Sequence, residues 1–175
     1  MNKRDRLVVL NKTAYERIAE VFSATRSKKS WEVLAVLAAE VREGSSILDL
    51  GCGNGRLLKA LPNVNFSYMG IDNNPYLLLV ARERFPNRKF IQQSLEELDL
   101  HGRQHDIIYC IAALHHLVDA SDRLSLLKKC NGALKPGGKL LVTVWDLWQP
   151  KFMKHFLSHM SWKISWKDMF IPWKA

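Results

Sequence analysis

Cysteine is scarce in this sequence of 175 residues, and the three that occur, Cys52, Cys110 and Cys130, show no Cys-x-x-Cys spacing. Such a set argues against a disulfide framework and against a zinc site, so we expect no metal and a reducing, cytoplasmic location. Long apolar runs are lacking too, since none reaches the ~20 residues of a membrane-spanning helix. The charged start Met1–Arg6 precedes only the short apolar run Leu7–Leu10, which is unlike a signal peptide. We therefore expect no membrane association.

Acidic residues are also in deficit, with 17 Asp and Glu against 26 Lys and Arg and a formal net charge of +9. The excess is uneven: residues 1–30 carry +5, residues 135–175 carry +5, and the stretch between them carries −1. One interpretation is a surface that is merely solubilising. The other is that the two basic flanks gather over one face and attract a polyanion such as RNA.

What the sequence does have is a glycine-rich turn between two apolar segments. Ile47–Leu50 suits a buried strand, and Gly51–Gly55 supplies three glycines. Arg56–Leu61 looks like a helix, and Phe66–Ile71 suits a second strand that ends at Asp72. This is the pattern of a βαβ unit, in which a ligand binds at the carboxyl ends of parallel strands. Glycines are needed in that turn because it is tight and the ligand must approach bare backbone.

A dinucleotide fingerprint, Gly-x-Gly-x-x-Gly, is absent, because its third glycine would fall at position 56, which is Arg56. A nicotinamide dehydrogenase is therefore disfavoured. With Gly55 one residue earlier, the segment is Gly-x-Gly-x-Gly behind Asp49, which resembles motif I of the class I S-adenosylmethionine-dependent methyltransferases. Asp72 is placed to accept hydrogen bonds from both ribose hydroxyls of such a cofactor. The alternative is a structural glycine turn followed by a surface aspartate.

The remaining segments are predicted from their periodicity and their helix signals. We expect strands at Lys89–Gln92, Asp106–Ile111 and Leu140–Trp145, and helices at Thr13–Phe22, Trp31–Val41, Pro75–Arg84 and Ser121–Leu134. The polar segment Ser23–Ser30 is expected to separate the first two of these helices. Ser121 or Asp122 is expected to cap the last helix, with Leu124, Leu127 and Leu134 facing inward.

The resemblance implies an α/β fold, a three-layer Rossmann-like domain with parallel strands in the order 3-2-1-4-5. The segment Leu134–Gly138, Leu-Lys-Pro-Gly-Gly, is a turn typical of the same family. The C-terminal strand pair of that fold is expected to be missing, because the chain stops first. We expect one domain over residues 1–175, with a helical cover (1–44), a cofactor-binding core (45–146) and a basic, tryptophan-rich tail (147–175).

The resemblance also implies contacts with S-adenosylmethionine and its product S-adenosylhomocysteine. The residues implied are Asp49, Gly51, Cys52, Gly53, Asp72, Asn73, Ser94, Leu95, Cys110 and Ile111. Cys52 is expected to be a small filler of the loop and not a nucleophile. Ser94 stands where the family has an acid that binds the adenine amino group, and a serine can accept that hydrogen bond without a charge.

The N-terminal segment indicates a narrower family. Tyr15-x-x-Ile18-Ala19-x-x-Phe22-Ser23-x-Thr25-Arg26 resembles the tRNA wobble-uridine methyltransferases that esterify a carboxymethyl group, and Asp168–Trp173 resembles another segment of the same family. This resemblance implies a tRNA substrate and a small activating protein subunit. It also gives Arg26 a catalytic part, in which its guanidinium holds the acceptor carboxylate or that of the cofactor.

His116 is the other predicted catalytic residue, since it matches a histidine beside the methyl-transfer centre of the family. An anionic carboxylate acceptor needs no general base, so His116 would orient it. A neutral acceptor would need a base, and His116 is the best candidate. Alternatively, His115 and His116 simply cap the segment after their strand. Adjacent histidines point in different directions and make poor metal ligands.

Two further functions stay open at this point. The fold suits a small-molecule methyltransferase equally well. A non-catalytic cofactor-binding or partner subunit is the other, favoured by Ser94 and by the early end of the chain. The tryptophans of the tail either belong to the core or stack on unpaired bases.

Overall fold

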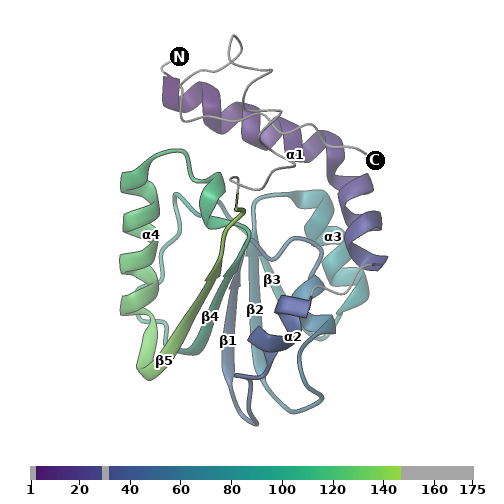
Figure 1. Ribbon diagram of the computed structural model, residues 1–175, viewed down its shortest axis with the longest axis vertical. Coiled ribbons are helices and arrows are strands. Elements are labelled where there is room, and N and C mark those ends of the chain that lie inside the picture. The colour runs from purple at the N-terminus through teal and green to yellow at the C-terminus, as the bar shows by residue number, and fades with distance from the viewer. Residues whose placement is uncertain (1–2, 29–31, 147–175) are drawn as a thin grey trace.

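The computed structural model describes residues 3–28 and 32–146. Within them lies one sheet of five parallel strands in the order β3-β2-β1-β4-β5, which confirms the predicted topology (Figure 1). The strands are β1 (Ser46–Leu50), β2 (Ser67–Asp72), β3 (Lys89–Gln92), β4 (His105–Ile111) and β5 (Leu134–Thr143). The α-helices are α1 (Lys3–Lys28), α2 (Glu32–Ala38), α3 (Pro75–Arg84) and α4 (Ala120–Gly132).

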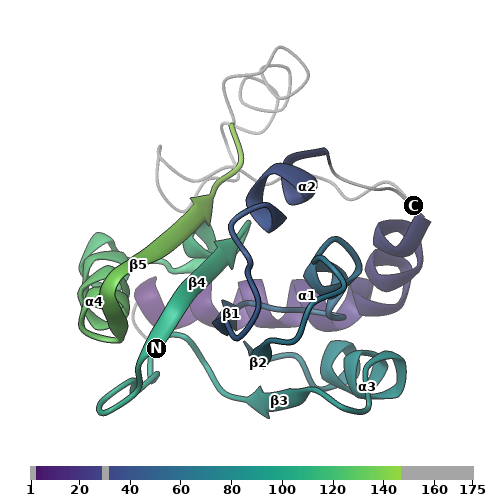
Figure 2. The same ribbon diagram turned by 90° about the horizontal axis from the view of Figure 1, so that it is seen from below.

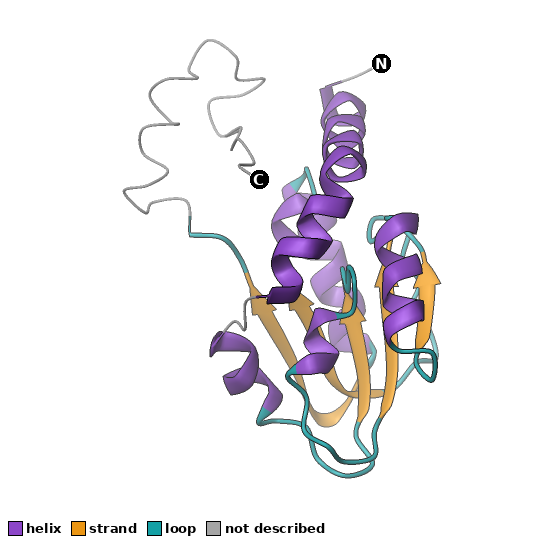
Figure 3. Ribbon diagram, turned by 90° about the vertical axis from the view of Figure 1, so that its right-hand side faces the viewer, coloured by secondary structure: helices purple, strands orange, loops and turns teal. Residues whose placement is uncertain are grey.

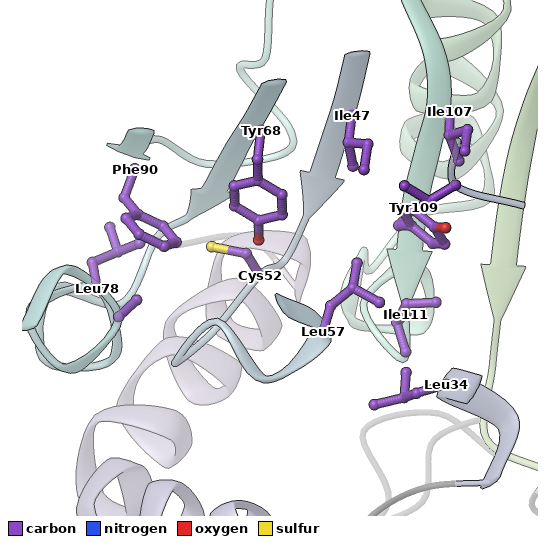
Figure 4. Close-up of a cluster of buried hydrophobic side chains, with 12 residues drawn as sticks. Leu34, Ile47, Cys52, Leu57, Tyr68, Leu78, Phe90, Ile107, Tyr109 and Ile111 are labelled. Carbon is purple, nitrogen blue, oxygen red and sulfur yellow. The ribbon is translucent and has the colours of Figure 1, made fainter. Parts of the chain in front are cut away.

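Alternation along the central strands divides the interior into two cores. Ile47 and Tyr109 point to one face, where they pack with Leu34 of α2 and Leu78 of α3 (Figure 4). The side chains at the alternate positions of the same strands point to the other face and pack with Leu126 and Cys130 of α4. These side chains belong to Leu48, Leu50, Ile108 and Cys110. Figure 2 shows α4 on one side of the sheet and α2 and α3 on the other. The result is the three-layer arrangement that the sequence predicts.

Helix α1 lies across the ends toward which the strands point, and it packs against α3 (Figures 1 and 3). It is continuous from Lys3 to Lys28, so the predicted break from Ser23 onward is wrong. Ser23 is buried, and its backbone carbonyl and hydroxyl oxygens both accept hydrogen bonds from the Asn54 amide. This tertiary contact outweighs the weak helix propensity of the serines and threonine there. No helix among the described residues is long and apolar enough to cross a membrane.

Three other predicted helices differ in detail. The segment after the glycine loop forms only a 3₁₀ turn, Arg56–Lys59, and α2 has seven residues. The N-cap position of helix α4 is Asp119 and not Ser121 or Asp122, and Leu124 is 54% exposed. Leu126 and Cys130 are buried in its place, because it is their face of the helix that packs in the second core.

The Leu-Lys-Pro-Gly-Gly segment is not a turn before β5 but a bulge within it. Leu134 pairs with His105 and Lys139 pairs with Ile107, so Lys135–Gly138 bulge out of the ladder, with Gly137 at φ +77°. Strand β5 therefore starts earlier than predicted and ends at Thr143 instead of Trp145. The predicted tail and its segment Asp168–Trp173 lie outside the described residues.

Candidate functional site

A cavity of about 610 Å³ lies at the carboxyl ends of the strands, between the sheet and α1. Its wall combines the glycine loop after β1, the ends of β2, β3 and β4, and one face of α1. Residues that line it include Tyr15, Gly51, Cys52, Gly53, Asn54, Asp72, Asn73, Ser94, Leu95, Glu96, Ile111, His116 and Trp145. The edge that carries this cavity is the one where open parallel sheets bind ligands.

The glycine loop is held by the end of β2. The backbone N–H groups of Gly51 and Cys52 both donate to the carbonyl of Ile71, at 2.8 and 3.1 Å. Gly51 has φ +71°, and a Cβ on it would lie 2.4 Å from the Cβ of Ala113. Only glycine fits this position, because both its backbone conformation and its clearance exclude a side chain. The loop thus offers bare backbone to the cavity.

Cys52 fills the space beneath the loop. Its side chain is buried, and burial raises the pKa of its thiol well above the usual range, so the thiolate is disfavoured. A Cβ on Gly70 would lie 2.8 Å from its Sγ, so Gly70 leaves the room that Cys52 occupies. Cys52, Cys110 and Cys130 are all free and buried.

Asp72 connects β2, the glycine loop and α3. One carboxylate oxygen accepts the N–H of Gly53 at 2.8 Å, and the other accepts the N–H of Asn74 at 2.9 Å. Burial raises the pKa of Asp72, and the hydrogen bonds from Asn74, Gly53 and Asn73 act against that rise. An ionised carboxylate has about four acceptor sites, so Asp72 keeps acceptor capacity for a ligand beside these backbone bonds.

Asp49 and Cys110 lie below the cavity and do not line it. Asp49 is 2% exposed, and the hydroxyl of Tyr68 donates to its Oδ2 at 2.7 Å. Burial raises the pKa of Asp49 to about 7. The alternation of β1 turns this carboxylate into the first core, where its partner Tyr68 lies. Cys110 is likewise buried, in the second core.

His116 and Tyr15 meet across the cavity. The Tyr15 hydroxyl oxygen and His116 Nε2 are 2.7 Å apart, and the two rings lie edge to face with centroids 4.8 Å apart. The Asn11 amide donates to the backbone carbonyl of His116 at 3.1 Å. Burial, and then the neighbouring His115, lowers the pKa of His116 to about 4. The imidazole is therefore neutral at pH 7, and α1 supplies its partner.

His115 packs against two neighbouring rings. Its ring lies 4.2 Å from that of His116 and 5.5 Å from that of Trp145, and neither of its buried ring nitrogens has a hydrogen-bond partner. Burial lowers its pKa. Within the described part of the chain, no group of three or more His, Cys, Asp or Glu residues could hold a metal ion.

Comparison with known families matches residues 47–138 to the family described as "Methyltransferase domain". The match covers more than half of the sequence and spans the glycine loop, Asp72 and His116. The chain belongs to the methyltransferase domain family.

Curated relatives of this methyltransferase domain include tRNA (carboxymethyluridine(34)-5-O)-methyltransferase ALKBH8 of Macaca fascicularis, 33% identical over 135 residues, covering 77% of this chain and 20% of that protein. The tRNA (carboxymethyluridine(34)-5-O)-methyltransferase of Schizosaccharomyces pombe is 32% identical over 160 residues, covering 91% of this chain and 65% of that protein. The chain thus spans less than two thirds of the length of either relative.

Among solved structures, the domain is similar to CalS10, an amino pentose methyltransferase from Micromonospora echinaspora that was solved with SAM bound. The TM-score is 0.59 at 25% identity, covering 75% of this chain and 58% of that one. The similarity supports the fold as that of a methyltransferase domain.

The structure brings most of the predicted site residues together. Eight of the ten predicted cofactor contacts line the cavity, all except Asp49 and Cys110, and His116 lines it as well. Arg26 belongs to α1, and its side chain lies outside the described residues. Sequence reasoning missed Asn11, Lys12 and Asn54 as lining residues, and it noted Tyr15 only as part of a family segment. The signal for α1 was its helical periodicity, but periodicity does not show which face meets the sheet ends.

Proposed function

We propose that this chain is an S-adenosylmethionine-dependent methyltransferase that acts in the cytoplasm on the carboxymethyl group of a wobble uridine in tRNA. The observation that carries the proposal is a single cavity that joins the glycine loop, the Asp72 carboxylate and the neutral Tyr15–His116 pair under α1. The curated relatives named above support the choice of acceptor.

The residues of the cavity fit an adenosyl cofactor. Asp72 has acceptor sites for the two hydroxyls of a ribose, and its own oxygens are fixed by Gly53 and Asn74. The bare backbone of Gly51 and Gly53 allows the close approach of the amino-acid end of the cofactor. When bound, S-adenosylmethionine supplies a methyl group on a positively charged sulfur.

The residues of this chain then align the acceptor with the methyl group and exclude water from the cavity. A carboxylate acceptor is anionic at neutral pH, so no proton has to be removed. The Tyr15–His116 pair is also uncharged at pH 7, and it can present one O–H or N–H donor to the oxygen of the acceptor that does not react. A cation at this position would draw charge from the reacting oxygen, and the lowered pKa of His116 avoids that.

The arrangement of charge is compatible with an RNA substrate. Lys12 lies at the rim of the cavity, and Lys12 and Arg17 of α1 are exposed. Cations at the mouth of the cavity would contact phosphates of the chain that carries the acceptor base. The small activating subunit that the sequence resemblance implies stays a prediction, tested by whether its addition raises turnover.

The test is methyl transfer from S-adenosylmethionine labelled in its methyl group to fractionated tRNA. A methyl ester is cleaved by mild alkali and releases labelled methanol, whereas a methyl group on nitrogen or carbon stays on the nucleoside. We expect alkali-labile label on tRNA that carries a carboxymethyl group and none on tRNA that lacks it. Alkali-stable label would contradict the proposed acceptor, and no label with any RNA would contradict the proposed substrate class.

His116→Ala tests the role of the histidine. We expect turnover to fall by about tenfold to a hundredfold while the affinity for S-adenosylhomocysteine stays within about threefold, because His116 lies on the acceptor side. The exposed His101 provides the matched control, His101→Ala. Unchanged turnover in His116→Ala would remove the residue from the mechanism.

A small-molecule methyltransferase is the competing function, favoured by the similarity to CalS10. Salt distinguishes the two, because RNA binding releases counterions and its affinity falls steeply between low and moderate salt. A KM for the acceptor that is insensitive to salt would favour the small molecule.

A further inference from the structure

The order of the strands fixes the order of chemical groups along the cavity. The end of β3 lies next to Asp72 at the end of β2, and the glycine loop and His116 follow on the other side. The N–H of Gln93 donates to the backbone carbonyl of Asp72 at 2.9 Å, so the segment after β3 begins directly beside that residue. This segment, Gln93–Glu97, lines the wall farthest along the sheet from His116.

A ligand that follows this order must place its base on the β3 side. Under the proposed function, on which this inference rests, the ribose lies at Asp72 and the reacting methyl group lies toward His116. Adenine, on the other side of the ribose, then lies against Gln93–Glu97. Its exocyclic amino group is a donor, so the wall has to supply an acceptor.

The proton of the Ser94 hydroxyl is already engaged, so only its uncharged oxygen is left to accept a further hydrogen bond. That hydroxyl donates to Oε2 of Glu96, and both side chains are partly buried in the wall. Leu95 between them packs against the second core, which fixes the turn that brings the two together. The Glu96 carboxylate keeps its other oxygen and further lone pairs. Glu97 also lines the cavity, but its residue is exposed.

We propose that Glu96, oriented by the Ser94 hydroxyl, is the residue that binds the adenine amino group and selects an adenosyl cofactor. A charge-assisted hydrogen bond from the amino group to a fixed carboxylate discriminates in two directions. It attracts the amino group of adenine, and it repels the carbonyl oxygen that hypoxanthine carries at the same position. The uncharged Ser94 thus acts through the acid two residues later.

Glu96 also has a competing role as a counter-charge for α1. The Arg4 guanidinium, whose pKa is raised first of all by Asp122, also feels the charge of Glu96. Arg4 is already paired with Asp119 at 3.0 Å and with Asp122 at 2.9 Å. A role limited to attracting Arg4 would leave base selection unchanged when Glu96 is replaced.

The experiment is calorimetric titration of the full chain with S-adenosylhomocysteine and with S-inosylhomocysteine, which has a carbonyl in place of the amino group. The unmodified chain is expected to prefer the adenosyl compound by about tenfold to a hundredfold, the range for a hydrogen bond to a charged group. In Glu96→Gln we expect the preference to fall below about threefold, because an amide can donate to the carbonyl. Glu83→Gln is the matched control, because Glu83 is exposed and lies outside the cavity wall, and it is expected to keep the preference.

Ser94→Ala provides a second variant that removes no charge. We expect it to fold normally and to lose part of the preference, because the carboxylate loses the hydroxyl that orients it. A full preference in Glu96→Gln, or in Ser94→Ala if the first variant fails to fold, would overturn the inference. Failure of the unmodified chain to bind S-adenosylhomocysteine would instead overturn the proposed function.

Discussion

At the scale of single residues, the site depends on the clearance between Gly51 and Ala113 and on the two backbone hydrogen bonds of Asp72. At Gly51 the backbone lies too close to Ala113 for any side chain to fit, and the Asp72 carboxylate is held by backbone N–H groups. The backbone of the loop can come close to a ligand only while Gly51 keeps its left-handed conformation. These residues are therefore expected to contribute to the stability of the fold as well as to ligand binding, and mutation can measure the contribution to stability.

Gly51→Ala tests that contribution. A left-handed backbone at φ +71° is strained by about 1–2 kcal/mol for alanine, and the contact with Ala113 adds to the strain. We expect urea denaturation to show a loss of more than about 2 kcal/mol. Gly102→Ala is the matched control, because Gly102 has φ +70° and nothing within 4 Å of its Cβ. Equal losses in the two variants would contradict the close contact at Gly51.

At the scale of elements, α1 acts as a cover that is attached at several points. The Arg4 guanidinium pairs with Asp119 and Asp122 near one end, Tyr15 meets His116 in the middle, and Asn54 of the glycine loop binds Ser23 near the other end. Exposed ion pairs contribute little to stability. Besides its packing against α3, the part-buried contact of Tyr15 and the buried contact of Ser23 are therefore the ones that keep the helix over the cavity.

Asn54→Ala is expected to loosen the cover without unfolding the domain. The variant loses two hydrogen bonds to Ser23, but it also removes an amide oxygen that is buried without a partner. Global stability should thus change by no more than about 1 kcal/mol. Hydrogen exchange should rise in the C-terminal half of α1. Asn65→Ala, which removes an exposed bond to Glu43, should leave that exchange unchanged. Unchanged exchange in Asn54→Ala would show that the helix is held by other contacts.

At the scale of the whole molecule, the sequence predicted the features that local patterns and family motifs determine. Apolar runs and helix signals predicted the strands and most of the helices, and the resemblance to the methyltransferase family predicted the sheet order and most of the cavity wall. The sequence could not predict which face of α4 is buried, since Leu124 and Leu126 are equally apolar and only packing separates them. The sequence also could not predict the contact between Tyr15 and His116, because the two residues are 101 positions apart and meet only through the tertiary fold.

Stability at different pH values reports on the buried carboxyl beneath the site. The folded-state pKa of Asp49, about 7, lies above its unfolded value, so the folded state binds the proton more tightly. The contribution of Asp49 to stability is therefore present at low pH and is lost as the pH rises through about 7. Asp49→Asn should be more stable than the unmodified chain at pH 8, by about 1–4 kcal/mol, and this gain should shrink at pH 5.

Asp106→Asn provides a control of opposite sign. Lys135 and the N–H of Ser46 lower the pKa of Asp106, so its contribution is present above its ordinary pKa and is lost as the pH falls. This variant should be less stable than the unmodified chain at pH 8. A destabilised Asp49→Asn at pH 8 would show that the ionised carboxylate is needed in the folded state.

The most direct measurement is a crystal structure of the chain with S-adenosylhomocysteine. We predict that both ribose hydroxyls lie within hydrogen-bond distance of the Asp72 carboxylate, with the amino-acid end of the ligand on the glycine loop and its base against Gln93–Glu97. A ligand whose ribose lies away from Asp72, or outside the cavity beneath α1, would contradict the account.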